Sequence, residues 1–132
     1  MKTILIADDK DSSRELIRAL LERSGYRVQE AADGTQALQQ ARSIAPDLIL
    51  LDLQMPRLDG FGVLRELRQD ARFHNIPVVA LTAYAMHGDR EKALEAGFTS
   101  YITKPVNLME LREHIARLLQ ASAQAQAAEA ND

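Results

Sequence analysis

The sequence contains no cysteine. This absence excludes disulfide bonds, thiolate zinc sites and catalysis by a thiol, and it agrees with a reducing compartment. An excess of positive charge is also missing, because 16 basic residues stand against 19 acidic residues and the formal net charge is −3. No broad basic surface is available to neutralise nucleic-acid phosphates, so we expect no direct binding to nucleic acid.

Long apolar runs are missing as well. The first run, Thr3 to Ala7, gives way to Asp8 and Asp9, which makes it too short for a signal-peptide core or a membrane span. We therefore predict a cytoplasmic protein without a membrane partner. The chain has 132 residues, of which 46% are hydrophobic, and this suits one globular domain with a single core. Residues 1–120 are predicted to form that domain.

Short apolar runs alternate along the chain with segments of helical periodicity. This alternation is typical of repeated βα units and a parallel sheet. The run that ends at Asp52 is apolar at consecutive positions, as expected for a central strand that is covered on both faces. The sequence therefore predicts an α/β fold with a doubly wound, five-stranded parallel sheet, whose strands span residues 3–7, 27–31, 47–52, 77–81 and 100–103.

The intervening segments are predicted to be helices. The first is expected to begin at Ser12, because Ser12 and Glu15 have the spacing of a capping box, and to end at Gly25. Its inner face is expected to carry Leu16, Leu20 and Leu21. The other helices are expected over residues 34–43 and 60–70, up to Gly97, and after Asn107.

The last residues, 121–132, are rich in alanine and glutamine and have no apolar stripe. Such a segment either extends the last helix into solvent or is disordered. We favour disorder for this tail.

Polar side chains follow four of the predicted strands, at the points where these strands end. They are Asp8 and Asp9, Asp52, Thr82, and Lys104, which Pro105 follows. The carboxyl ends of parallel strands meet at one edge of the sheet, where open α/β sheets bind their ligands. We therefore expect these residues to form one site.

Three carboxylates in one place repel one another unless a cation compensates them. Mg²⁺ binds carboxylate oxygens, water and substrate phosphate oxygens, and Asp8, Asp9 and Asp52 supply such carboxylates. The absence of cysteine, and of histidine beside the three acids, disfavours the softer transition metals. The sequence thus predicts a Mg²⁺ site, with Mn²⁺ as an alternative ion.

The chain resembles the receiver domain of bacterial two-component response regulators over residues 2–119. The resemblance rests on four motifs in the family's order, each at the end of its own strand: Asp8-Asp9, Asp52-Leu53-Gln54-Met55-Pro56 with Asp59-Gly60, Thr82-Ala83, and Lys104-Pro105. It implies the flavodoxin-like (βα)5 fold with strand order 2-1-3-4-5. It also implies a stand-alone regulator, with a receiver module cut from a hybrid kinase as the alternative.

By this resemblance, Asp52 accepts a phosphoryl group from a phosphohistidine on a histidine kinase or a histidine phosphotransfer protein. The implied Mg²⁺ ligands are Asp8, Asp9, Asp52 and the main-chain carbonyl of Gln54. Lys104 and Thr82 are implied to contact phosphoryl oxygens, and a cis bond before Pro105 is expected to aim the lysine inward. Beyond its own phosphorylation and dephosphorylation, the protein is not expected to be an enzyme.

The resemblance also implies a switch. Phosphorylation adds roughly one and a half to two negative charges, and in response Thr82 moves toward the phosphoryl group while Tyr101 turns from exposed to buried. The face of the fourth helix, fifth strand and fifth helix then binds a downstream protein target. We expect a monomer or a weak phosphorylation-dependent dimer. Gln54 and Tyr84 are expected to flank the site and to affect the access of water.

Three other interpretations stay open. A haloacid-dehalogenase-like phosphatase also uses a strand-ending aspartate, but it has a second aspartate two positions later, where this chain has Gln54. A flavin or nucleotide carrier needs a phosphate-binding loop after the first strand, where Asp8 and Asp9 would repel phosphate. The third is an adaptor that uses its surface without phosphorylation, and an intact acceptor set argues against it only weakly.

Overall fold

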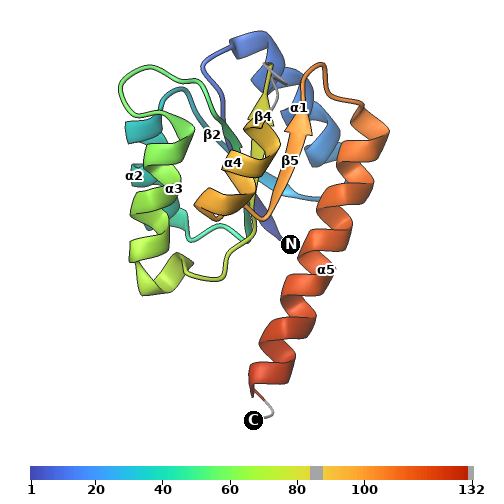
Figure 1. Cartoon of the computed structure of the whole chain (residues 1–132). Helices are drawn as coiled ribbons and strands as arrows, with labels where there is room; N and C mark the ends of the chain where they lie inside the picture. Colours follow the sequence, from blue (N-terminus) through green and yellow to red (C-terminus); the bar gives the residue numbers. More distant parts are fainter. Residues whose placement is uncertain (84–87, 131–132) are drawn as a thin grey trace.

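The computed structural model describes residues 1–83 and 88–130, in which strands and helices alternate (Figure 1). The strands are β1 (Thr3–Ala7), β2 (Arg27–Ala31), β3 (Leu48–Asp52), β4 (Val78–Thr82) and β5 (Ser100–Thr103). The helices are α1 (Asp11–Arg23), α2 (Gly34–Ile44), α3 (Gly60–Gln69), the 3₁₀ turn η1 (Ala71–Phe73), α4 (Asp89–Ala96) and α5 (Leu108–Ala130). The bounds of all five predicted strands agree with these to within one residue.

The five strands form one parallel sheet in the order β2-β1-β3-β4-β5, which confirms the predicted fold. Ala7 pairs with Leu51, and Leu51 pairs with Ala80, so β1, β3 and β4 end at the same edge. The chain winds outward in both directions from β1 and β3, and a crevice forms where the strand order reverses. That crevice lies at the carboxyl ends of the two central strands.

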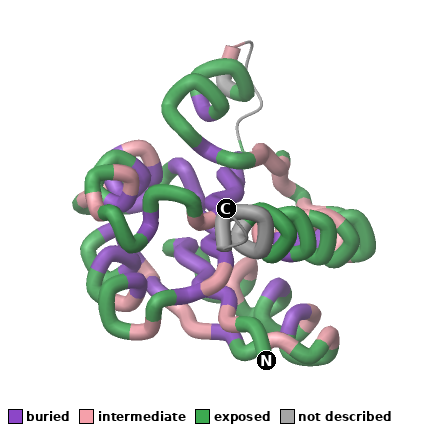
Figure 2. Tube along the Cα trace, turned by 90° about the horizontal axis from the view of Figure 1, so that it is seen from below, coloured by how far each residue is buried: buried purple, intermediate pink, exposed green. Residues whose placement is uncertain are grey.

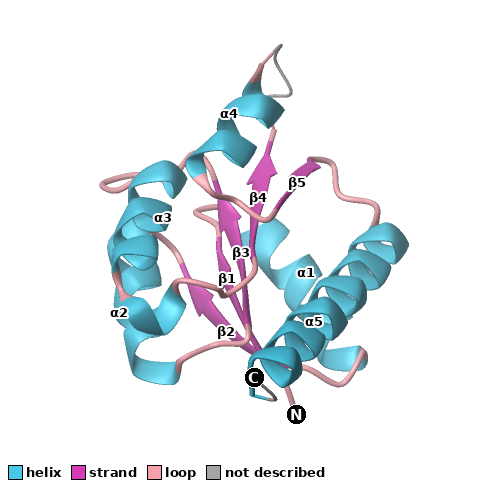
Figure 3. Ribbon diagram, turned by 60° about the horizontal axis from the view of Figure 1, so that its bottom comes forward, coloured by secondary structure: helices cyan, strands magenta, loops and turns pink. Residues whose placement is uncertain are grey.

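Helices cover both faces of the sheet: α1 and α5 lie on one side, and α2, α3 and α4 on the other (Figure 3). Every residue of β3 and β4 is buried, as expected for strands between two helical layers. Figure 2 shows the buried residues gathered in the strands and on the inward turns of the helices. The side chains that α1 and α5 bury in this core are Ile17, Leu21, Leu111, Ile115 and Leu119.

Helix α1 begins earlier than predicted. It starts at Asp11, and its N-cap residue Lys10 makes no side-chain capping bond, so the predicted start at Ser12 with a capping box is wrong. The turn into the helix is shaped instead by Asp8, whose Oδ1 accepts a hydrogen bond of 2.9 Å from the backbone N–H of Lys10.

Helix α1 also turns a different stripe inward than predicted. Ile17 and Leu21, one turn apart, are buried, and Leu20 is partly buried against the same core. Leu16 is 56% exposed, so its predicted place on the inner face is wrong. Adjacent helix positions are rotated by roughly 100°, and this rotation carries Leu16 away from the sheet once Ile17 faces it.

Helix α5 continues to Ala130 and extends past the body of the domain (Figure 1). Its start agrees with the prediction, because the side chain of Asn107 accepts a hydrogen bond of 3.1 Å from the backbone N–H of Glu110. In the structure residues 121–130 continue this helix, which is the other of the two forms considered for the tail. None of the described helices has the length and apolar character needed to cross a membrane.

Candidate functional site

Three carboxylates meet at the carboxyl edge of the sheet. Asp8 and Asp9 follow β1, and Asp52 is the last residue of the adjacent strand β3. One carboxylate oxygen from each lies within 4.8 Å of the others. Asp8 and Asp52 are buried, whereas Asp9 is exposed. Sequence positions far apart are thus brought together by strand pairing, as predicted.

Lys104 reaches this group from the end of β5. Its Nζ donates hydrogen bonds to Asp8 Oδ2 at 2.8 Å and to Asp52 Oδ2 at 3.0 Å. Its backbone N–H donates to the carbonyl of Thr82 at 2.7 Å, and the Lys104–Pro105 peptide bond is cis. The lysine is only 12% exposed, so a single sequestered ammonium is shared by two buried carboxylates.

Backbone N–H groups hold the other oxygens of the two buried acids. Oδ1 of Asp8 accepts from the N–H of Lys10 at 2.9 Å, and Oδ1 of Asp52 accepts from the N–H of Gln54 at 3.0 Å. Each carboxylate therefore accepts from the ammonium and from one backbone amide, and Asp8 also accepts from the hydroxyl of Ser13, which fixes their orientation.

The two buried acids titrate differently. Burial acts to raise the pKa of Asp8, but hydrogen bonds from Lys104, the N–H of Lys10 and the hydroxyl of Ser13 outweigh it and leave this pKa below 3.8. Burial also raises the pKa of Asp52, and there the N–H of Gln54 and the ammonium of Lys104 do not compensate it fully. Burial opposes the charge of Lys104, yet its two carboxylate partners raise its pKa. Asp8 is thus the more firmly ionised acid.

The group opens into a cavity of about 560 Å³. Asp9, Asp52, Gln54 and Lys104 line it, so four residues predicted from the sequence share one space. Lys10 and Asp59 also line it. Sequence analysis gave neither residue a role at the site, although Asp59 belongs to the second motif and Lys10 directly follows the first.

The remaining predicted residues lie around this cavity. Thr82 is buried at the end of β4, next to Asp52 in the sheet. Tyr101 is half-buried on β5, where it packs against the core beneath α2, α3 and α4, and it lines a second cavity beside α5. Gln54 is exposed, and Tyr84 lies outside the described residues.

Sequence analysis missed Arg14. Its Nη1 donates a hydrogen bond of 2.7 Å to the main-chain oxygen of Asp8, so it reaches the site from α1. The only signal in the sequence was a basic residue shortly after two acids, and such a residue is usually part of a solvated helix face.

The residues present suit a hard divalent cation. All ligand atoms on the three acids are carboxylate oxygens, and Mg²⁺ prefers oxygen ligands and binds through one or two carboxylates plus water and phosphate. Asp9 is exposed beside two buried acids, so one side of the group is open to solvent. Asp8, Asp9 and Asp52 are the residues that could hold the ion.

Known proteins share this sequence pattern. The response regulator receiver domain matches residues 4–116. The polar-differentiation response regulator DivK of Brucella anthropi is 40% identical over 114 residues, which cover 86% of this chain and 93% of DivK. DivK of Brucella ovis is equally similar.

Solved structures share the fold. A response regulator from Chloroflexus aurantiacus has a TM-score of 0.86 and 33% identity, covering 90% of this chain and 98% of that one. The receiver domain of the sensor histidine kinase PA1611 from Pseudomonas aeruginosa has a TM-score of 0.84 and 39% identity with the same coverage, and it has a magnesium ion coordinated in its active site cleft. The chain therefore belongs to the response regulator receiver family of two-component signalling.

Proposed function

We propose that this receiver accepts a phosphoryl group on Asp52 from a phosphohistidine of a histidine kinase or a histidine phosphotransfer protein. The observation that carries the proposal is the convergence of Asp8, Asp9 and Asp52, whose oxygens lie within 4.8 Å, beside Lys104. A carboxylate can form an acyl phosphate as the intermediate of such a transfer. Positioning and charge stabilisation supply most of the catalysis in these reactions.

In the transfer, a carboxylate oxygen of Asp52 forms a bond to phosphorus while the bond from phosphorus to the donor's imidazole nitrogen breaks. The electron pair of that bond stays on the imidazole. The Lys104 ammonium, which already contacts Asp52 Oδ2 at 3.0 Å, stays beside the new phosphoryl group and pairs with one of its oxygens. We assign a second oxygen to the hydroxyl of Thr82, from the neighbouring strand.

Asp8 and Asp9 are proposed to hold Mg²⁺ together with Asp52 and the main-chain carbonyl of Gln54. When bound, the ion neutralises the charge that gathers on the phosphoryl oxygens. Mn²⁺, which also prefers oxygen ligands, is an alternative. This assignment is supported by the all-oxygen donor set and by the magnesium ion in the related Pseudomonas receiver domain.

The output is proposed to be a changed binding face on α4, β5 and α5, which contacts a downstream protein in the cytoplasm. Tyr101 lies half-buried on β5 at a cavity beside α5, so a shift of its ring would alter that face. Two states that differ by a few kcal/mol suffice, because the new phosphoryl contacts can bias them. We propose a monomer or a weak dimer that forms on phosphorylation.

Intact-mass measurement tests the acceptor. Wild type and Asp52→Asn are incubated with Mg²⁺ and phosphoramidate, a small donor with a phosphorus–nitrogen bond like that of phosphohistidine. We expect one added phosphoryl group on wild type and none on the variant, and none on wild type after chelation of the metal. An unlabelled wild type would favour the adaptor that works without phosphorylation, and equal labelling of both proteins would move the acceptor elsewhere.

The switch is tested separately with Tyr101→Ala. We expect this variant to be labelled like wild type but to bind its partner with altered affinity. Loss of labelling would instead assign Tyr101 to the support of the fold.

A further inference from the structure

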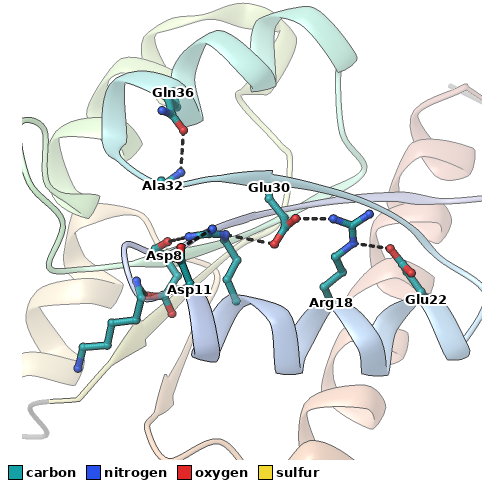
Figure 4. Close-up of polar contacts among 9 residues, drawn as sticks. Asp8, Asp11, Arg18, Glu22, Glu30, Ala32 and Gln36 are labelled. Carbon is teal, nitrogen blue, oxygen red and sulfur yellow. Dashed lines mark hydrogen bonds and ion pairs between the residues drawn. The ribbon is translucent and has the colours of Figure 1, made fainter.

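Arg14 ties the turn that carries Asp8 and Asp9 to two other elements. Its Nη1 donates to the main-chain oxygen of Asp8 at 2.7 Å, and its Nη2 donates to Asp11 Oδ1 at 2.7 Å. Its Nε donates to Glu30 Oε1 at 3.1 Å. Figure 4 shows Glu30 extending from β2 toward α1. All three guanidinium nitrogens therefore bind different acceptors, from the turn, from α1 and from β2.

The bond to the Asp8 carbonyl has a specific geometric effect. This carbonyl belongs to the peptide unit that ends at the nitrogen of Asp9, and a peptide unit is rigid and planar. Arg14 thus fixes the plane from which Asp9 starts. On the preceding side, the N–H of Asp8 donates to the carbonyl of Ala31 at 3.1 Å, so β2 holds one side of Asp8 and Arg14 of α1 holds the other.

Asp9 depends on this turn more than the other two acids do. Asp8 and Asp52 are buried and are oriented by Lys104. Asp9 is exposed, so packing does little to direct its side chain. The peptide plane held by Arg14 fixes the backbone nitrogen from which Asp9 and its side chain extend.

We propose that Arg14 is a positioning residue for the metal ligands, acting through the Asp8–Asp9 peptide plane. The inference rests on the proposed function, because it needs Mg²⁺ to bind at these acids. Residues that orient metal ligands from behind typically change metal affinity about 10-fold to 100-fold when they are lost. We expect an effect at the lower end, because Lys104 and backbone bonds still hold Asp8.

Charge and positioning predict effects of opposite sign at this residue. Arg14 is a cation near three acids, so on charge alone its removal would strengthen Mg²⁺ binding. A positioning role predicts weaker binding. Lysine keeps the charge but cannot replace the planar fork of donors. Arg14→Lys should therefore leave Mg²⁺ binding unchanged if only charge matters, and weaken it if positioning matters.

Arg18 supplies a matched control, since it lies one helical turn farther along α1. It binds the other carboxylate oxygen of Glu30, and Glu22 as well (Figure 4). Arg18→Gln therefore removes one positive charge and one partner of Glu30 from the same ion-pair network. It leaves the bond from Arg14 to the Asp8 carbonyl in place.

The experiment is a Mg²⁺ titration of wild type, Arg14→Lys, Arg14→Gln and Arg18→Gln. Binding is measured by calorimetry and by the shifts of the backbone amide NMR signals of Asp9 and Lys10. We expect the Mg²⁺ dissociation constant to rise about 10-fold in both Arg14 variants and to stay the same or fall in Arg18→Gln. Urea unfolding without metal identifies any variant that is not folded. If Arg14→Gln is unfolded, the Mg²⁺ dissociation constant of Arg14→Lys alone tests the positioning role.

Phosphorylation gives a second readout. In the Arg14 variants, the Mg²⁺ concentration for half-maximal labelling by phosphoramidate should rise by the same factor, while the maximal rate at saturating Mg²⁺ is kept. Unchanged or tighter Mg²⁺ binding in both Arg14 variants overturns the inference, and so does equal weakening in Arg18→Gln. A wild type that binds no Mg²⁺ overturns the metal part of the proposed function as well, so the two failures are distinguishable.

Discussion

The ammonium of Lys104 donates a hydrogen bond of 3.0 Å to Asp52, across the end of the strand that separates β5 from β3. The same ammonium binds Asp8 at 2.8 Å. One cation thus holds two buried carboxylates in place. The stability of the metal-free protein should depend on this lysine. A second cation should reduce the remaining repulsion among the acids.

Replacing Lys104 by methionine should destabilise the metal-free protein by about 3 kcal/mol, because breaking a buried ion pair leaves its charges uncompensated. Urea denaturation measures the loss. Lys10→Met is the control, since Lys10 is exposed and contacts Asp8 through its backbone N–H. The control should stay within about 0.5 kcal/mol of wild type, and a Lys104→Met protein as stable as wild type would contradict the role of the lysine.

Asp52→Asn should stabilise the metal-free protein at pH 7. Burial raises the pKa of Asp52 in the folded state above 3.8, so its ionised form costs stability at any pH above that raised pKa. The cost disappears as the pH falls through the raised pKa toward 3.8. The advantage of Asp52→Asn in urea denaturation should therefore be largest at neutral pH and should shrink on acidification.

Asp70 is a control for this pH dependence, because its pKa is shifted in the opposite direction from that of Asp52. Arg72 lowers the pKa of Asp70 to about 2, so ionised Asp70 stabilises the fold above 3.8, and this contribution is lost as the pH falls toward 2. Asp70→Asn should be less stable than wild type at pH 7. A pH curve for Asp52→Asn that runs parallel to that of Asp70→Asn would show that the Asp52 pKa is not raised.

Asp9→Asn should separate metal binding from folding. Asp9 is exposed, so without metal its amide variant should unfold within about 0.5 kcal/mol of wild type. A ligand that binds the folded state at 100 times its dissociation constant stabilises it by about 2.7 kcal/mol. At that Mg²⁺ concentration wild type should gain this amount in urea denaturation and the variant clearly less. Equal gains would remove Asp9 from the set of ligands.

Gly60→Ala should disturb the phosphoryl acceptor through its backbone. A Cβ at Gly60 would lie 2.6 Å from the carbonyl oxygen of Asp52 and 2.8 Å from Cα of Leu53. Both are backbone atoms at the end of β3, so the variant should lose about 1–3 kcal/mol of stability and label more slowly with phosphoramidate.

Gly62→Ala is the matched control in the same helix. Its nearest atom would be Cδ1 of Leu58 at 2.5 Å, the tip of a side chain that can move aside. Its labelling should therefore stay close to that of wild type, and its stability should exceed that of Gly60→Ala. If the two variants label equally slowly, the contact with Asp52 is not the cause.

The predictable part of the site consists of residues that end strands. Asp8 and Asp52 stand at the ends of apolar runs that identify buried parallel strands, Lys104 follows the partly exposed strand β5, and the ends of parallel strands share one edge. Their contact at that edge follows from local pattern and a general rule of topology. Leu16 shows the limit of that approach, because a stripe of leucines does not say which side of a helix faces the sheet.

The residues that support the backbone of the site could not be predicted, because their contacts depend on distances between separate elements, which no local pattern contains. Arg14 reaches the Asp8 carbonyl because α1 packs beside β2, where Glu30 accepts a hydrogen bond from the same guanidinium. Gly60 is needed because α3 begins against the carbonyl of Asp52.

The sequence by itself determined where the strands lie and which polar residues follow each of them, because burial and periodicity are properties of short segments. The tertiary structure alone decided that one lysine serves two carboxylates, that Leu16 faces outward and that Arg14 holds the peptide plane before Asp9. These depend on how separate elements pack, and packing is settled only when the whole core closes.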